Sequence, residues 1–148
     1  MAWWKILVIL LVVIDTNVLL VSVSDRSKYH WLYKAIIEKR INIAFTGEVL
    51  HEYEEQIAIH WHPEVAVNVV RSLLELSTAR FVVVYFNMRI LTNDEDDNKF
   101  VDCAFAANAD YIVSNDSHFN ILKQTPFPQI KVVCLDEFRE ILIDQNII

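Results

Sequence analysis

The sequence predicts an α/β fold of three layers, in which a central, mainly parallel sheet lies between two layers of helices. One observation is that short apolar runs alternate with amphipathic helical segments, the pattern of strand–helix–strand units. Another is that the first run, Ile6–Ile14, is uninterrupted and apolar, as expected for a strand buried on both faces. With 148 residues and 54% hydrophobic content, we expect a single domain over 1–148 with its core over about 6–142.

The first half of the chain is divided by residues that favour the starts of helices. Thr46 is a typical N-cap residue, and Pro63 is of the type tolerated in a first helical turn. The expected elements are a strand over Ile6–Ile14, a helix over Lys28–Lys39, a strand over Ile41–Phe45, a helix from Thr46 to about Ile59 and a helix opened by Pro63. The residues of the Thr46 helix expected to face inward are Val49, Leu50, Tyr53 and Ile57.

The second half continues the alternation of strands and helices. An acidic segment leads into a helix, and a loop bounded by prolines separates the last two strands. The expected elements are a strand over Phe81–Tyr85, an acidic loop or helix start over Asn93–Asn98, a helix over Phe100–Asn108, a strand over Tyr111–Ser114, a strand over Ile130–Cys134 and a helix over Asp136–Leu142.

Composition excludes several classes of function. The formal charge of −7 argues against a broad basic surface for nucleic acid, although bound divalent cations can invert the field of an acidic cleft. A single glycine excludes glycine-rich nucleotide loops, which need several. The two cysteines show no disulfide framework, so a reducing cytoplasm is expected. The run that ends at Ile14 is too short to span a bilayer, and Trp3 and Trp4 form an extension whose role the sequence does not show.

Acidic residues follow two of the predicted strands. Asp15 ends the first apolar run, and Asp116 follows Tyr111–Ser114. Because carboxyl ends of parallel strands meet at one edge of a sheet, these acids can face a shared pocket. The run Asp94–Asp97 and Glu52 supply further carboxylates. A set of oxygen ligands without clustered imidazoles or thiolates favours Mg²⁺ or Mn²⁺ over zinc.

Ordinary structural roles are alternatives for some of these acids. Asp94–Asp97 can complement a helix dipole, and Glu54 and Glu55 fit a solvated helix face. Asp102 can pair with Lys99 on the surface of a helix.

The histidines offer a rival metal site. His60 and His62 stand two residues apart, a spacing that in a helix points the two imidazoles to opposite sides. Neither His30, His51 nor His118 completes a zinc spacing with them. We therefore expect no metal at His60–His62.

Four segments in order resemble the PIN (PilT N-terminal) domain family of metal-dependent ribonucleases. They are Val13–Leu19 with the sequence VIDTNVL, the helix Thr46–Tyr53 carrying Glu52, Asp94–Ala104 with the sequence DEDDNKFVDCA, and Ala109–Phe119 with the sequence ADYIVSNDSHF. With flanking strands, the resemblance covers about Ile6 to Val133. It is closest to PIN proteins assigned as toxins of bacterial toxin–antitoxin pairs.

This resemblance implies a PIN-like domain that hydrolyses RNA phosphodiester bonds with Mg²⁺ or Mn²⁺. The implied acidic catalytic site consists of Asp15, Glu52, Asp97 and Asp116, with Asn17 and Ser114 in support. Asp15 and Asp116 are the implied principal metal ligands, Asp97 is a further ligand and Asp102 a candidate one. Glu52 and Asp97 complete the metal shell, directly or through water, or orient the nucleophile. An antitoxin protein and a second copy of the chain are the implied partners. One departure is Asn115, where many relatives have glycine, and another is the long apolar stretch before Asp15.

Two other functions are compatible with the same fold class. A PIN-like domain can serve as a protein-interaction module without catalysis, although intact acids speak against this. A further alternative is another Mg²⁺-dependent phosphoryl-transfer domain, such as an aspartate-nucleophile phosphatase or a receiver. The phosphatase needs a second aspartate where Asn17 stands, and no convincing phosphoacceptor ends a middle strand as a receiver requires.

Overall fold

The computed structural model describes residues 9–148, and its centre is a five-stranded sheet. The strands are β1 (Leu11–Ile14), β2 (Asn42–Phe45), β3 (Ala79–Phe81), β4 (Tyr111–Val113) and β5 (Val132–Val133). They lie in the order β3-β2-β1-β4-β5, and each neighbouring pair in the described part of the chain is parallel. The α/β class and the parallel sheet are therefore confirmed.

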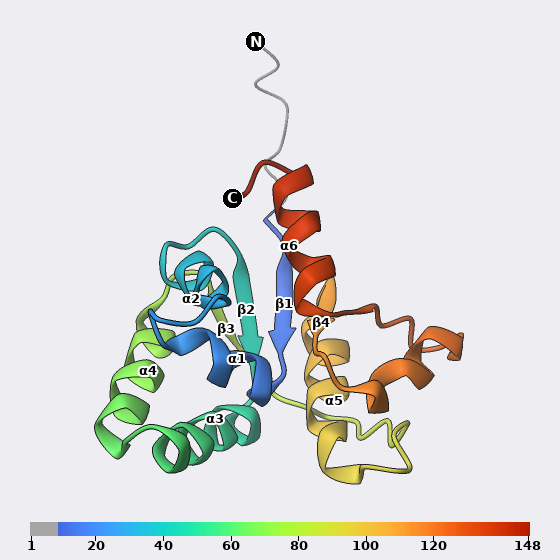
Figure 1. Cartoon of the computed structure of the whole chain (residues 1–148). Coiled ribbons are helices and arrows are strands. Elements are labelled where there is room, and N and C mark those ends of the chain that lie inside the picture. The colour runs from blue at the N-terminus through green and yellow to red at the C-terminus, as the bar shows by residue number, and fades with distance from the viewer. Residues whose placement is uncertain (1–8) are drawn as a thin grey trace.

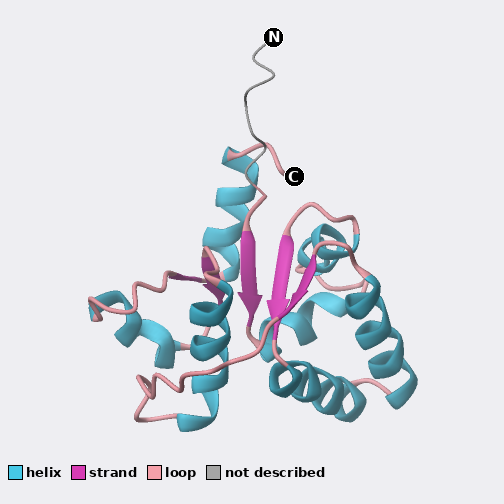
Figure 2. Cartoon of the chain, turned by 180° about the vertical axis from the view of Figure 1, so that it is seen from behind, coloured by secondary structure: helices cyan, strands magenta, loops and turns pink. Residues whose placement is uncertain are grey.

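Helices cover both faces of this sheet. They are α1 (Thr16–Val23), α2 (His30–Ile37), α3 (Gly47–His60), α4 (Pro63–Glu75), α5 (Asn98–Ala107) and α6 (Leu135–Asp144), with 3₁₀ helices η1 (Glu95–Asp97) and η2 (Ser117–Gln124). Figure 1 shows α1 to α4 gathered beside β2 and α5 beside β4. Figure 2, seen from behind, shows α5 in front of the strands, on the face opposite α6. The three-layer architecture is confirmed.

The predicted helix starts at Thr46 and Pro63 are confirmed. The Thr46 hydroxyl accepts the Val49 N–H at 3.1 Å, which satisfies one of the free donors of the first turn of α3. Pro63 is the first residue of α4, where its missing N–H costs nothing. The α3 residues predicted to face inward are the ones that are buried, namely Val49, Leu50, Tyr53 and Ile57.

Two helices distant in sequence pack together on one face. Phe138 of α6 is fully buried and contacts the rings of Trp31 in α2 and Tyr111 in β4, with centroids 6.4 and 6.3 Å apart. Such tilted aromatic pairs bury large apolar area and fix the orientation of the packed elements. They hold α2 and α6 against the same side of the sheet.

Helix α1 was not predicted, and the first strand is shorter than expected. The strand predicted over Ile6–Ile14 is confirmed only for Leu11–Ile14; Ile9 and Leu10 lie outside it. Positions 1–8, with Trp3 and Trp4, lie outside the described residues. Most side chains of α1 are buried, so the helix lacks the polar stripe that reveals a surface helix.

The third strand is displaced from its predicted position. Sequence analysis expected it over Phe81–Tyr85, but β3 is Ala79–Phe81 and the residues after it leave the sheet. Within the expected strand, Val83 and Tyr85 are solvent-exposed, whereas Val82 and Val84 are half-buried. The expected strand Ile130–Cys134 likewise contracts to Val132–Val133, and η2 was not predicted.

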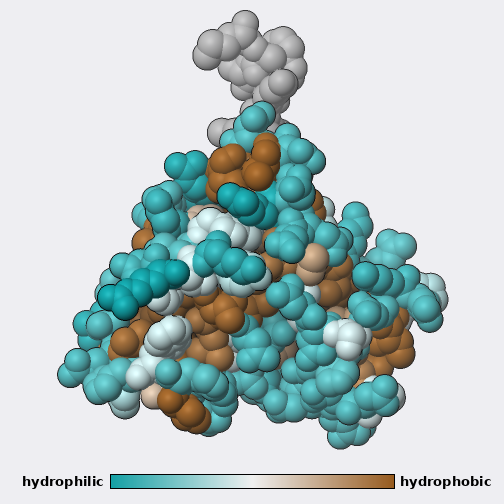
Figure 3. Space-filling view, viewed as in Figure 1, coloured by the Kyte–Doolittle hydropathy of each residue, from teal (hydrophilic) through white to brown (hydrophobic). Residues whose placement is uncertain are grey.

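The apolar content of the chain is concentrated in the core between the layers. Residues of β1, β2 and β4 are almost completely buried. The face seen in Figure 3 is mainly hydrophilic, and hydrophobic residues show on it in separate patches. Over residues 9–148, no helix has both the length and the apolar character needed to cross a membrane.

Candidate functional site

The site is built at the edge of the sheet where β1 and β4 end. Asp15 follows β1 directly, is only 6% exposed, and its N–H donates to the Val113 carbonyl at 3.0 Å. The Ser114 hydroxyl donates to Oδ2 of Asp15 at 2.7 Å and accepts the Asp116 N–H at 3.0 Å. Ser114 therefore joins the ends of the two strands through its hydroxyl.

Asp116 lies at the start of η2, with its side chain partly exposed. Its Oδ1 accepts the N–H of His118 at 2.9 Å, which caps the 3₁₀ helix. Asn17 lies on α1 and lines a cavity of about 280 Å³ together with Asp15 and Asp116. The two strand-end acids and Asn17 thus share one solvent-accessible hollow.

A second set of carboxylates reaches the site from the segment before α5. The Asp94 and Asp97 carboxylates and the His118 imidazole offer ligand atoms that all lie within 4.8 Å of one another. Nδ1 of His118 is 3.3 Å from Asp94 Oδ2, 3.9 Å from Asp97 Oδ2 and 3.3 Å from Asp116 Oδ1. His118 is therefore the residue on which the two groups of acids converge.

Glu52 approaches from α3 and is held by two partners. The hydroxyl of Thr16, next to Asp15, donates to Glu52 Oε2. The ammonium of Lys99 lies 2.6 Å from Glu52 Oε1 and 3.1 Å from Asp96 Oδ2, and the Lys99 side chain is only 8% exposed. Burial lowers the pKa of Lys99, but its hydrogen bonds and charge contacts with Glu52 and Asp96 outweigh this, so the pKa is raised.

The next residue on α3 fixes the end of β1. The hydroxyl of Tyr53 is fully buried and donates to the Ile14 carbonyl, one residue before Asp15. Burial, followed by the nearby groups of Cys103, Asp15 and Glu52, raises the Tyr53 pKa well above its ordinary value. Tyr53 thus remains a neutral donor that holds the strand end in place.

The pKa values show that these acids repel one another. Burial raises the pKa of Asp15, and the charges of Asp116 and Glu52 add to the effect against the hydrogen bond from Ser114. Burial, followed by the charges of Asp15, Asp94 and Asp116, raises the pKa of Asp97 to about 7. Glu52, Asp97 and Asp116, all expected from the sequence, are therefore within electrostatic reach of Asp15.

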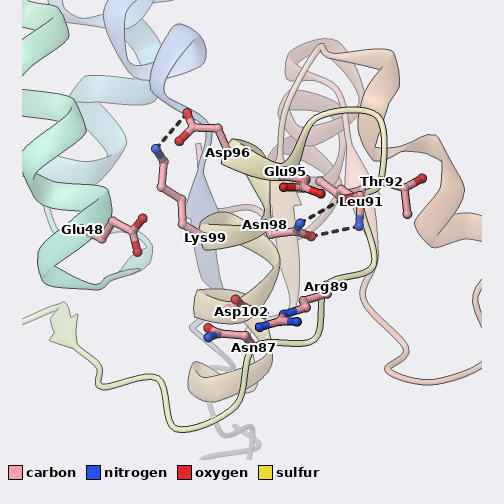
Figure 4. A pocket seen from close by; sticks show the side chains of 10 residues that line it. All are labelled: Glu48, Asn87, Arg89, Leu91, Thr92, Glu95, Asp96, Asn98, Lys99 and Asp102. Carbon is pink, nitrogen blue, oxygen red and sulfur yellow. Dashed lines mark hydrogen bonds and ion pairs between the residues drawn. The ribbon is translucent and has the colours of Figure 1, made fainter.

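Asp102 lies apart from this cluster. It is buried, its Oδ1 accepts the Met88 N–H at 2.8 Å, and it lines a polar cavity of about 480 Å³. Figure 4 shows Asp102 beside Asn87 and Arg89, while Lys99 and Asp96 lie at the other end of the cavity. Burial raises the pKa of Asp102. The surface pair of Asp102 with Lys99 considered in the sequence analysis is wrong, because Lys99 pairs with Glu52 and Asp96.

The departure at Asn115 has a structural explanation. Its side-chain Oδ1 accepts the N–H of Leu135 at 2.9 Å, the first residue of α6. Its φ is not positive, so the position does not need glycine. Asn115 therefore supports the start of α6 without disturbing Ser114 and Asp116 on either side.

His60 and His62 lie at the corner between α3 and α4. His60 Nδ1 is 2.9 Å from the Gln56 carbonyl, and His62 accepts the Glu64 N–H as the N-cap of α4. Among the described residues, the group with convergent metal-ligating atoms is Asp94, Asp97 and His118, and it includes neither of them.

Several residues of the site escaped the sequence analysis. They are Thr16, which is next to Asp15, His118, which is two residues after Asp116, and Lys99, which is two residues after Asp97. Neighbourhood in sequence was thus the signal that could have found them. Only the pairing of β1 with β4, and the packing of α3 beside them, decides which of these side chains point to the shared edge.

The raised pKa of Asp97 predicts a pH-dependent stability for the metal-free protein. Between its ordinary pKa of 3.8 and about 7, the folded chain holds a proton that the unfolded chain has released, so stability falls as pH rises through this interval. Asp97→Asn removes this contribution. In chelator, the melting temperature of the variant minus that of the wild type should increase from pH 4.5 to 7.5 and then level off. A difference that does not change with pH would contradict the assignment.

The chain is similar to known proteins over most of its length. A family model described as PIN domain matches residues 11–118. No curated protein sequence matches the chain. Among solved structures, a chain of VapBC2 from Rickettsia felis, bound to a DNA fragment from its promoter, is 16% identical with a TM-score of 0.56, covering 84% of this chain and 98% of that chain.

A second solved structure is similar to the same extent. It is Mycobacterium tuberculosis VapC20, described as a sarcin-ricin loop cleaving toxin, with 11% identity and a TM-score of 0.57. The similarity covers 80% of this chain and 98% of that chain. At these identities the two structures support the fold.

Proposed function

Since this chain belongs to the PIN domain family, we propose that it is a divalent-metal-dependent ribonuclease. The observation that carries the proposal is the convergence of Asp15, Asp97 and Asp116 from three separate segments onto one sheet edge. Like charges held close together, one of them buried, are costly to the fold, which supports a role for these acids in binding a cation. The substrate class, RNA, rests on the family.

The donor set fits Mg²⁺ or Mn²⁺. Carboxylate oxygens are the ligands these ions favour, and burial together with neighbouring carboxylates raises the pKa of both Asp15 and Asp97, so a bound cation would favour their ionised forms. We assign Asp15, Asp97 and Asp116 as ligands. A cation held there supplies a Lewis acid, which activates water and stabilises negative charge on the phosphate oxygens.

The other predicted residues act through these ligands in our proposal. Both oxygens of Glu52 are already engaged, by Thr16 and Lys99, so Glu52 orients the start of α1 beside Asp15. Ser114 orients Asp15 and Asp116 together. Asp102, which contacts Met88, is left outside the proposed ligand set.

The proposed biological role is that of the toxin in a toxin–antitoxin pair. It is supported by family membership and by a fold shared with VapBC2 and with VapC20, which is described as a toxin. An antitoxin protein and a homodimer are the proposed partners. Co-purification with the product of an adjacent small reading frame tests the first, and light scattering tests the second.

Cleavage assays test the enzymatic proposal. Purified protein is incubated with single-stranded RNAs, structured RNAs and a sarcin–ricin loop RNA, in Mn²⁺, in Mg²⁺ and in chelator. We expect cleavage with metal that is lost in chelator and in Asp116→Asn. Glu54→Gln, which neutralises an exposed acid of α3, is the matched control and should cleave like the wild type.

Two outcomes of this assay would contradict the proposal. Cleavage that persists unchanged in chelator or in Asp116→Asn would exclude the acidic site as its source. A protein that binds its antitoxin but cleaves no RNA of the panel would favour the alternative of a PIN-like interaction module without catalysis.

A further inference from the structure

His118 lies in the acidic site but is not among the residues that the family resemblance implies. It follows Asp116 by two residues on η2, and its Nδ1 lies within 4 Å of carboxylates from Asp94, Asp97 and Asp116. No other imidazole in the described part of the chain belongs to a convergent group of ligand atoms. The His118 imidazole therefore shares one small volume with the Asp94 and Asp97 carboxylates, and the Asp116 carboxylate lies beside its Nδ1.

This position is fixed by the structure on both sides of His118. The backbone N–H of His118 donates to Asp116 Oδ1 at 2.9 Å. The next residue, Phe119, is fully buried and packs edge-on against Phe100 of α5, with ring centroids 6.4 Å apart. Because α5 follows directly from Asp97, this contact sets η2 against the segment that carries Asp94 and Asp97.

We propose that His118 is a direct nitrogen ligand of the catalytic cation and that the site consequently prefers Mn²⁺ to Mg²⁺. The inference rests on the proposed function for the presence of a divalent cation at this edge. It goes beyond that function by naming one further ligand, His118, and the preferred metal, Mn²⁺.

The chemistry of the two ions gives the preference its direction. Mg²⁺ demands oxygen ligands in near-ideal octahedral geometry and keeps several waters, so an imidazole contributes little to its binding. Later divalent metals accept imidazole alongside carboxylates, and their affinity rises from Mn²⁺ onward in the series. A site of three carboxylates and one imidazole therefore prefers Mn²⁺ to Mg²⁺ more strongly than a site of carboxylates alone.

Metal coordination can be measured without any RNA. Pulsed electron paramagnetic resonance of the Mn²⁺-loaded protein detects a coordinated ¹⁴N nucleus through its modulation of the echo. We expect this modulation in the wild type, its loss in His118→Asn, and its retention in His60→Asn. His60 is the matched control because it is an exposed histidine whose ring lies on the last turn of α3.

Calorimetric titrations measure the selectivity. His118→Asn should weaken Mn²⁺ binding by roughly tenfold and change Mg²⁺ binding much less, with circular dichroism showing a retained fold. Mn²⁺ binding without nitrogen modulation, modulation that survives in His118→Asn, equal losses for both metals, or no Mn²⁺ binding would each overturn the inference. In the first two cases His118 is a counter-ion of the acids and not a ligand.

The outcomes separate this inference from the proposed function. Nitrogen coordination in a protein that cleaves no RNA would leave His118 as a metal ligand and defeat the ribonuclease assignment. Metal-dependent cleavage without nitrogen coordination would support the ribonuclease assignment and exclude His118 as a metal ligand.

Discussion

Asp15→Asn is expected to reduce metal-dependent RNA cleavage by about 100-fold or more while leaving the metal-free protein as stable as the wild type or more stable. Asp15 is almost fully buried, and its pKa is raised by burial and by the charges of Asp116 and Glu52. A raised pKa means that the fold disfavours the ionised form relative to the unfolded chain at neutral pH. The neutral amide removes this penalty, and its oxygen can still accept the Ser114 hydroxyl.

Thermal melting with chelator and with excess Mn²⁺ separates the two effects of Asp15→Asn. Metal should raise the melting temperature of the wild type, because it binds the folded state, and should raise that of the variant much less. Glu54→Gln controls for the loss of one negative charge at an exposed position. If Asp15→Asn melts well below the wild type in chelator, Asp15 is a structural hydrogen-bond partner and the shared-site interpretation fails.

Lys99→Met is expected to produce the largest loss of stability, on the order of 3 kcal/mol in chelator, the lower end for breaking a buried ion pair. The lysine side chain is 8% exposed and that of Glu52 is 20% exposed. Removing the ammonium leaves the Glu52 carboxylate without its cation, close to Asp15. The free energy of unfolding from urea denaturation measures the effect.

A double-mutant cycle shows whether the loss comes from the Lys99–Glu52 pair. Glu52→Gln removes the charge that Lys99→Met leaves unpaired, so the double variant should recover a large part of the lost stability. Lys123→Met, at an exposed lysine of η2, is the control for the substitution itself. Additive losses in the double variant would show that Lys99 stabilises the fold by packing and not by its charge.

The sequence was sufficient for most of the architecture because its elements carry local signals. The capping hydroxyl of Thr46, Pro63 at a first turn and the apolar stripes of α3 and α4 each specify an element through neighbours within a few residues. Helix α1 could not be predicted, since it is buried on several sides and its valines also favour strands. The run Phe81–Tyr85 misled because its composition is typical of a strand, whereas only Phe81 belongs to β3 and the alternate side chains Val83 and Tyr85 are exposed.

The acids were easier to predict than their partners. Asp15 and Asp116 follow apolar strands, and parallel strands bring their ends together in any doubly covered sheet. The contacts of Glu52 with Thr16 and Lys99 depend on how α3 and α5 are rotated against the sheet, which no local pattern encodes. The same holds for His118, whose ring reaches Asp94 only because Phe119 packs on Phe100.

The central position of β1 has a consequence for the order of events during synthesis. β1, which Asp15 follows directly, is translated before both of its neighbours, and one of them, β4, starts about a hundred residues later. Until Tyr111–Val113 has been made, β1 has an unpaired edge and Asp15 has neither Ser114 nor Asp116 beside it. Pairing over such a separation is slow. A nascent or truncated chain that stops before β4 therefore carries no assembled acidic site, and the activity proposed for the protein begins only after β4 and Asp116 have been translated.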